Sequence, residues 1–320
     1  MDFIASFLSS PYNPVNLRQR SRRTKAYLAL AMVCFFWGTT WLASKQGVKY
    51  MPAFQMAGIR QFIGGSVYVL YFIISGKARW PNAKEWKTIL VLALFNFILS
   101  NGLATWGLQY ISGGLAAIIN AIVPLWLVIN SFFSKGPSIS KKAVLGFTVG
   151  FAGICIIFYE HLHDFLQAGF TLGIIISLAA TWTWAMGTVY TKQHAKSFNP
   201  YFGIGLQMAV SGLVLSAIAS ITGKSVPLTQ VPWQAWAAIG YLVFFGSVIS
   251  FLAYLYALQH LSAAQTSLYA YINPIVAVLL GFLLFDEPLT WFIATGGAVT
   301  LYGVYLVNNA FKKTSSTNSK

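Results

Sequence analysis

Long runs of apolar residues, separated by short polar segments, extend from residue 26 to residue 309. A helix needs roughly 20 apolar residues to cross the hydrocarbon layer of a membrane. The runs do not alternate polar and apolar residues as the strands of a membrane barrel do, and a helix satisfies its own backbone hydrogen bonds in lipid. The pattern predicts an all-α integral membrane protein with ten transmembrane helices, at residues 26–44, 53–75, 88–108, 112–134, 142–159, 170–190, 201–221, 235–258, 262–285 and 290–309.

The composition agrees with this pattern. Hydrophobic residues make up 57% of the 320 positions and charged residues 8%, whereas soluble domains carry about 25% charged residues. A net charge of +15 can indicate nucleic-acid binding, but the basic residues lie in short segments between the apolar runs rather than on one amphipathic face. We therefore expect contact with membrane lipid and no nucleic-acid partner. Cys34 and Cys155 both fall inside apolar runs, so no disulfide is expected.

The distribution of basic residues predicts the orientation. With a cytoplasmic N-terminus, 17 of the 21 Lys and Arg residues fall on the inner side. The outer side then holds only Lys45, Lys49 and Lys224, with Arg60 inside the second span. This bias follows the positive-inside rule. We expect a multi-pass protein of the inner (plasma) membrane with both termini cytoplasmic.

The chain also repeats itself at an offset of 150 residues. GLQYISGGLAAIINAIVP at 107–124 and ALQHLSAAQTSLYAYINP at 257–274 share Leu, Gln, Ser, Ile and Pro at five places. Each half then holds five spans, and an odd number inverts the second half relative to the first, as in many secondary transporters. Chance similarity between apolar sequences is the alternative. The predicted organisation is a basic cytoplasmic tail at 1–25, a first five-helix repeat at 26–160, a second, inverted repeat at 168–310 and a cytoplasmic tail at 311–320.

Several of these segments resemble the drug/metabolite transporter superfamily, and within it the EamA-type ten-helix exporters. The resemblance covers roughly residues 26–310 and is carried by FFWGTTWLASK, by IRQFIGG, by NAIVP and by the closing INPIVAVLLGFLLFDEPLTWFIATGGAVTLYGVYLV. It implies transport of amino acids, nucleotide-related metabolites or toxic amphiphiles. The first half departs from the pattern, because Lys135-Gly136-Pro137 stands where an acidic residue and a proline are expected.

Arg60 is the first candidate for binding a substrate. It lies roughly 10 Å below the outer surface at 1.5 Å per residue, where a charge must face protein or a cavity or extend to the interface. Its guanidinium can bind a carboxylate or phosphate through two parallel hydrogen bonds. The structural alternatives are hydrogen bonds to backbone carbonyls, or a side chain that reaches the membrane surface.

Two prolines mark equivalent places in the two halves. Pro124 and Pro274 each remove a helical hydrogen bond and loosen the helix. Together with Asn120 and Asn273 they indicate kinks near the midplane, where alternating access needs its site. A kink that serves packing alone is the alternative.

Aromatic and amide side chains inside the spans are expected to line the path. Each could instead belong to the core, face lipid or join helices. The candidates are Trp37, Trp41, Asn101, Trp106, Trp182, Trp184, Gln207, Tyr256 and Tyr271. Asp286-Glu287-Pro288 is expected to form a tight outer turn whose acids lie at the positive N-terminal end of the last helix.

The sequence lacks the motifs of an enzyme. It contains no HExxH, GxSxG or Walker loop, and its four histidines are too scattered for a metal site. We expect no cofactor, no metal and no catalytic residue. The expected function is export of small amphipathic metabolites, such as amino acids or their derivatives, by alternating access. Because no acidic residue lies within a span, uncoupled facilitation or exchange is preferred over proton-coupled efflux. A channel, or a scaffold or receptor without transport, is a further alternative.

Overall fold

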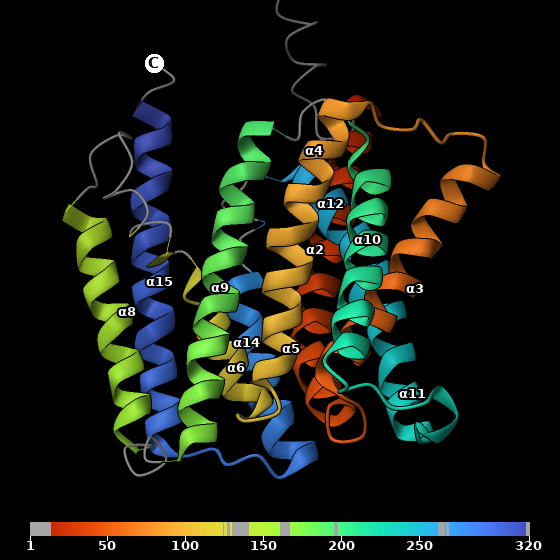
Figure 1. Cartoon of the computed structure of the whole chain (residues 1–320). Coiled ribbons are helices and arrows are strands. Elements are labelled where there is room, and N and C mark those ends of the chain that lie inside the picture. The colour runs from red at the N-terminus through yellow and green to blue at the C-terminus, as the bar shows by residue number, and fades with distance from the viewer. Residues whose placement is uncertain are drawn as a thin grey trace, which may run out of the picture.

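The computed structural model describes residues 14–123, 125–126, 129, 141–160, 167–194, 198–261, 266 and 269–317, and all their regular structure is helical (Figure 1). The elements are α2 (Pro14–Gly47), α3 (Ala53–Ile74), α4 (Ala83–Leu92), η1 (Ala93–Asn101), α5 (Gly102–Gly107), α6 (Gly113–Asn120), α8 (Lys141–Glu160), α9 (Ala168–His194), α10 (Pro200–Ile221), η3 (Leu228–Gln230), α11 (Trp233–Tyr241), η4 (Leu242–Ile249), α12 (Ser250–His260), α14 (Tyr269–Phe285) and α15 (Trp291–Thr317).

Within this described part, six helical stretches are long and apolar enough to cross a membrane. They are residues 22–47, 53–74, 83–107, 168–191, 200–221 and 233–260. Three shorter apolar helical segments are Val144–Ile157, Tyr269–Phe285 and Trp291–Val307. The predicted span at 112–134 is described mainly through α6, and Pro124 lies outside the described residues. The helices are those of a membrane protein.

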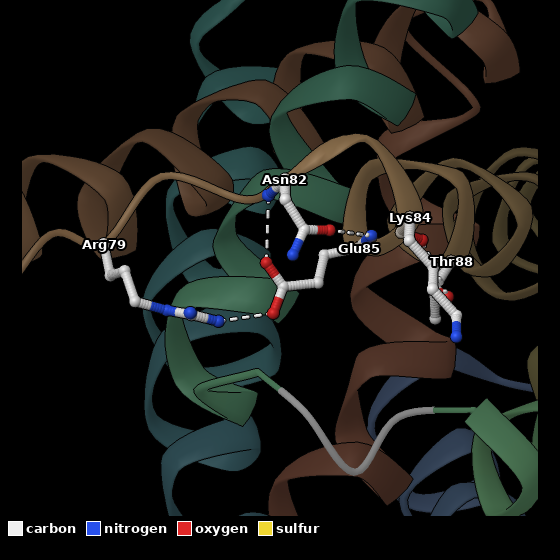
Figure 2. A network of polar contacts seen from close by, with 5 residues as sticks. All are labelled: Arg79, Asn82, Lys84, Glu85 and Thr88. Atoms are coloured by element: carbon white, nitrogen blue, oxygen red, sulfur yellow. Dashed lines mark hydrogen bonds and ion pairs between the residues drawn. The ribbon is translucent and has the colours of Figure 1, made fainter.

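The third predicted span begins five residues earlier than expected, at Ala83 instead of residue 88. Asn82 and Glu85 form a reciprocal cap: Glu85 N donates to Asn82 Oδ1 at 2.9 Å, and Asn82 N donates to Glu85 Oε2 at 2.9 Å. Figure 2 shows this pair together with the ion pair between Arg79 and Glu85. Such a cap satisfies two of the free N–H groups at a helix start, so the helix can begin outside the apolar run.

Two π-helical segments interrupt the regular helices, which the apolar pattern did not predict. η1 lies between α4 and α5, and η4 lies between α11 and α12. η1 thus falls in the third of the ten predicted spans and η4 in the eighth. A π-turn changes the backbone hydrogen-bonding pattern and is frequent at functional sites.

Close helix pairs depend on glycine. α3 packs against α10, and α8 packs against α15. A Cβ at Gly65 would lie 2.3 Å from the backbone nitrogen of Ala209, and one at Gly153 would lie 2.4 Å from the backbone nitrogen of Thr300. Only a residue without a side chain fits at these two crossings.

These pairs lie on opposite sides of the middle of the bundle. In Figure 1, α8 and α15 form one edge, α3 and α10 lie toward the other, and α2 and α14 run between them. The connection between α14 and α15 lies at the end we call the lower end, whereas α15 ends at the opposite, upper end.

We expect Gly65→Ala to lower the melting temperature of the protein. The added methyl group would meet backbone atoms, which cannot rotate away, and overpacking of this kind costs about 1–3 kcal/mol. Thermal unfolding in detergent measures the effect. Gly240→Ala is the matched control, because a Cβ there would meet no described heavy atom within 4 Å. An equal loss in both variants would contradict the role of close contact.

Candidate functional site

Arg60 is buried between α3 and η4. The residue is 7% exposed, and its Nε donates to Ser247 Oγ at 3.2 Å. A Cβ at Gly246 would lie 3.1 Å from a terminal nitrogen of the guanidinium, so the glycine leaves the space that the guanidinium fills. The side chain therefore packs against the π-helical segment and does not extend to the surface.

The charge of Arg60 has little local compensation. Within the described residues, the one ion pair joins Arg79 to Glu85, and no carboxylate there lies within 4.0 Å of Arg60. The guanidinium has five N–H donors, of which Ser247 receives one. A buried cation is costly unless an anion or further acceptors approach it. The geometry therefore suits the binding of an anionic group.

Side chains from α2 and α3 bind the backbone carbonyls of η4 and its surroundings. Trp37 Nε1 donates to the carbonyl of Gly246 at 3.2 Å. The hydroxyl of Tyr68 donates to the carbonyl of Val248 at 2.7 Å and more weakly to that of Ser247 at 3.3 Å. These bonds fix the π-helical segment of the second half against two helices of the first.

Aromatic rings gather around Trp37. Its ring centroid lies 5.2 Å from that of Phe251, 5.2 Å from that of Tyr254 and 5.1 Å from that of Tyr269. Trp184 of α9 lies near the hydroxyl group of Tyr269. The cluster thus connects α2, α9, α12 and α14. Such a lining suits the apolar part of a ligand and can attract an amino group through the ring faces.

Asn273 and Pro274 lie in the same region of α14 and are both buried. The amide nitrogen of Asn273, in the orientation that satisfies it, donates to the carbonyls of Cys34 at 2.8 Å and Tyr269 at 3.1 Å. The proline ring cannot donate a backbone hydrogen bond and disturbs the helix. Asn273 therefore ties a weakened part of α14 to α2.

Of the residues expected to line a path, the structure connects Trp37, Arg60, Trp184 and Asn273 through this shared set of contacts. The remaining ones lie in other surroundings. Trp41 is half-buried against the core cluster around Ile118, and Trp182 is 41% exposed. The ring centroid of Trp106 lies 5.4 Å from that of Phe54, and the ring centroid of Tyr256 lies 4.3 Å from that of His260. The hydroxyl of Tyr271 donates to the carbonyl of Val304 at 3.1 Å.

The three other amides among the candidates lie elsewhere. Gln207 is buried in α10, and Asn120 is half-buried at the end of α6. Asn101 ends η1, and its Oδ1 is buried with no hydrogen-bond partner among the described protein atoms. Pro124 lies outside the described residues.

Sequence reasoning missed four residues of this region. Tyr68 donates a hydrogen bond to a carbonyl of η4, and Ser247 of η4 accepts one from Arg60. Tyr254 belongs to the aromatic cluster. Gln61 follows Arg60, and both of its amide atoms are buried and have no hydrogen-bond partner among the described atoms. The spacing of eight residues between Arg60 and Tyr68 places both on one face of a helix and was a usable signal. Ser247, a small residue in an apolar run, offered none.

A second polar contact lies at the lower end of the bundle, and it corrects an expectation. Glu287 was expected to face the start of the last helix. Instead it accepts hydrogen bonds from the backbone of Gly113 at 2.7 Å and Gly114 at 2.9 Å, at the start of α6. The start of α15 is capped by Thr290, whose Oγ1 accepts from the backbone of Ile293 at 3.2 Å. The nearby threonine leaves Glu287 free to reach the other helix.

Comparisons with known proteins agree with a transporter. The model of the EamA-like transporter family matches residues 24–159 and again residues 171–309. An inner membrane transporter of Escherichia coli K12, YedA, described as uncharacterized, is 31% identical over 87% of this chain and 89% of its own length. The uncharacterized transporter YvbV of Bacillus subtilis is 28% identical over 91% of this chain and 93% of its own length.

A solved crystal structure also shares the fold. It matches with a TM-score of 0.60 at 20% identity, over 89% of this chain and 97% of that one. Relatives and family alike are transporters, so the resemblance to the drug/metabolite transporter superfamily is confirmed. The chain belongs to the EamA-like transporter family and is a membrane transporter, not an enzyme.

Proposed function

We propose that this transporter exports small amphipathic metabolites, such as amino acids or their derivatives, across the inner membrane by alternating access. The observation that carries the proposal is Arg60, a buried cation beside an aromatic cluster and without a carboxylate partner among the described residues. A substrate carboxylate would receive the unused guanidinium donors, and the rings around Trp37 would enclose the apolar part.

We further propose that ten helices form two inverted five-helix repeats, with 1–25 and 311–320 as cytoplasmic tails. Two findings support this arrangement. The family model matches the chain twice, over residues 24–159 and over residues 171–309, and these ranges nearly coincide with the two proposed repeats. The glycine contacts are also symmetric: Gly58 packs against Gly212, and Gly65 packs against Gly205. Gly205 and Gly212 follow Gly58 and Gly65 by 147 residues, so exchanging the two halves converts one contact into the other.

The same exchange relates the pair α8 and α15. Gly146 packs against Gly303, and Gly153 packs against Gly296. Gly296 and Gly303 follow Gly146 and Gly153 by 150 residues, so these two contacts are also converted into each other. A twofold axis in the membrane plane is the symmetry that inverted repeats produce. In such a transporter, the states open to the two sides of the membrane differ mainly by rocking of one half against the other. Both halves contribute residues to the substrate site between them.

The basic residues support the proposed orientation. Several of the described ones lie near the start of α2, between α3 and α4, and at the start of α8, at the upper end of the bundle (Figure 1). By the positive-inside rule, this supports a cytoplasmic upper end. The lower end, with the connection between α14 and α15, then faces outward. Arg60 lies closer to this outer end than to the inner one, since α3 begins at Ala53.

Energy coupling follows from the position of the acids. The described ones, Glu85, Asp286 and Glu287, lie at the start of α4 or in the connection after α14, away from Arg60. Proton-coupled carriers commonly use carboxylates or histidines within the membrane. We therefore propose facilitated export or exchange, with proton-coupled efflux as the alternative that the second experiment below tests.

We expect Arg60→Gln to reduce transport of the substrate by about 10- to 100-fold, the effect of losing a charge-assisted hydrogen-bonding partner. Candidate substrates come from comparing the metabolites of cells that overproduce the chain with those of cells lacking it. Transport into proteoliposomes is then measured with each labelled amino acid in turn. Arg79→Gln, which removes a guanidinium whose side chain is 65% exposed, is the matched control and should change the rate less than twofold. Normal transport by Arg60→Gln would contradict the proposed site.

We expect counterflow of the substrate to proceed without a pH gradient, because no proton-binding group is proposed in the path. The measurement compares accumulation of labelled substrate in proteoliposomes with and without an imposed gradient. Strict dependence on the gradient would favour proton-coupled efflux instead. Flux that neither saturates nor shows countertransport would indicate a channel, and an absence of flux would favour a scaffold or receptor.

A further inference from the structure

A carboxylate from the second half of the chain is inserted into the first half at the lower end of the bundle. Glu287 lies in the connection between α14 and α15, and its two carboxylate oxygens accept the backbone hydrogen bonds of Gly113 and Gly114, at 2.7 and 2.9 Å. Its own backbone N–H donates to the carbonyl of Gly281 at 3.1 Å. Both the side chain and the backbone of Glu287 are thus held in place.

Three glycines leave the space that this carboxylate occupies. A Cβ would lie 3.2 Å from a carboxylate oxygen if added at Gly113, 3.3 Å if added at Gly114 and 2.7 Å if added at Gly281. Two of these glycines belong to α6 and one to α14. The carboxylate therefore fits into a socket formed by both halves.

The electrostatics of the socket favour a negative charge. The start of a helix carries a partial positive charge, and hydrogen bonds to a carboxylate are stronger than those between neutral groups. Lys45 interacts electrostatically with Glu287, while its Nζ donates to the carbonyl of Leu108 at 2.7 Å. A positive charge on α2 thus lies near the socket, without forming an ion pair within 4.0 Å among the described residues.

The helix α6 does not depend on Glu287 alone for its start. Ser112 is a local cap, since its Oγ accepts from the backbone of Leu115 at 3.1 Å. Glu287 therefore adds a contact between the halves to a helix start that already has a cap. A second contact between the halves, formed by Gln55 and the backbone of Val226 at 2.7 and 2.9 Å, is neutral.

We infer that Glu287 is a gating residue, whose carboxylate latches the connection between α14 and α15 onto α6 and holds the lower end of the bundle closed. The inference rests on the proposed alternating access, because that mechanism requires contacts between the halves at one end to break when that end opens. When the lower end opens, the carboxylate leaves the two backbone N–H groups and enters water.

The sequence does not repeat the acid at the equivalent place. The residue 150 positions before Glu287 is Pro137, and Lys135-Gly136-Pro137-Ser138 contains no carboxylate. If both halves made the same contacts, the state with the lower end closed and the state with the upper end closed would have similar free energies. The contact of Glu287 lowers the free energy of the state in which the lower end is closed and so favours that state.

The test measures the distance between the two connections that the latch joins. Spin labels are placed at Gln109→Cys and Leu289→Cys, which are both exposed, in the full-length protein carrying Cys34→Ala and Cys155→Ala. Double electron–electron resonance in lipid nanodiscs gives the distance distribution without any substrate. We expect one dominant short distance with Glu287 present. Glu287→Gln should add a longer distance and shift the ratio of the two states by roughly 10- to 100-fold.

The adjacent acid is a matched control. Asp286 is exposed and has a left-handed backbone with φ 54°, which asparagine tolerates well. Asp286→Asn removes the same charge one residue away and should leave the distances unchanged. Glu287→Asp keeps the charge but is too short to reach both N–H groups, so an intermediate shift is expected even if Glu287→Gln does not fold.

Two results would overturn the inference. One is an unchanged distance distribution in the Glu287 variants. If the melting temperature falls while the distances stay the same, Glu287 only caps the helix and does not hold the lower end closed. The other is an equal shift in Asp286→Asn. The outcome is separate from that of the substrate proposal: normal transport by Arg60→Gln would refute the solute site and leave a distance shift in Glu287→Gln as evidence for the latch.

Discussion

A backbone N–H or C=O group without a partner is costly in apolar surroundings, and this constraint decides where the polar side chains of the transporter lie. Trp37 and Tyr68 bind carbonyls of the π-helical segment η4. Asn273 binds carbonyls beside Pro274, and Glu287 binds the free N–H groups at the start of α6. At η4, beside Pro274 and at the start of α6, a side chain from another helix or connection thus binds the exposed backbone groups.

The same interruptions shape the candidate site. Gly246 in η4 leaves space for the guanidinium of Arg60, and the carbonyls of this segment are held by two helices of the first half. An arginine in this position has a charge that Ser247 alone does not compensate. The site therefore combines fixed walls, which come from packing, with unused hydrogen-bond donors, which a substrate can use. This combination of a rigid surround and unsatisfied donors is what a selective binding site requires.

Part of this arrangement could be predicted residue by residue. Arg60 and Asn273 are conspicuous because polar groups are costly within an apolar run. Trp37 and Trp184 begin two similar segments, WGTTWLASKQ and WAMGTVYTKQ. Ser247 and Tyr254 were missed, since a serine or a tyrosine within a helix is ordinary until its neighbour is known. Trp182, 41% exposed, shows that composition does not tell which face of a helix a ring occupies. The acid Glu287 was assigned to the nearest helix start along the chain, but it reaches one 173 residues away.

The sequence by itself determined the helical class, the family and the positions of most apolar helices, because these depend on local composition and on spacing along one chain. Only the tertiary structure decided which helix starts and carbonyls the polar side chains reach, and where the helices become π-helical. Those contacts join residues far apart in the chain, and their geometry depends on how whole helices cross, which no local pattern encodes.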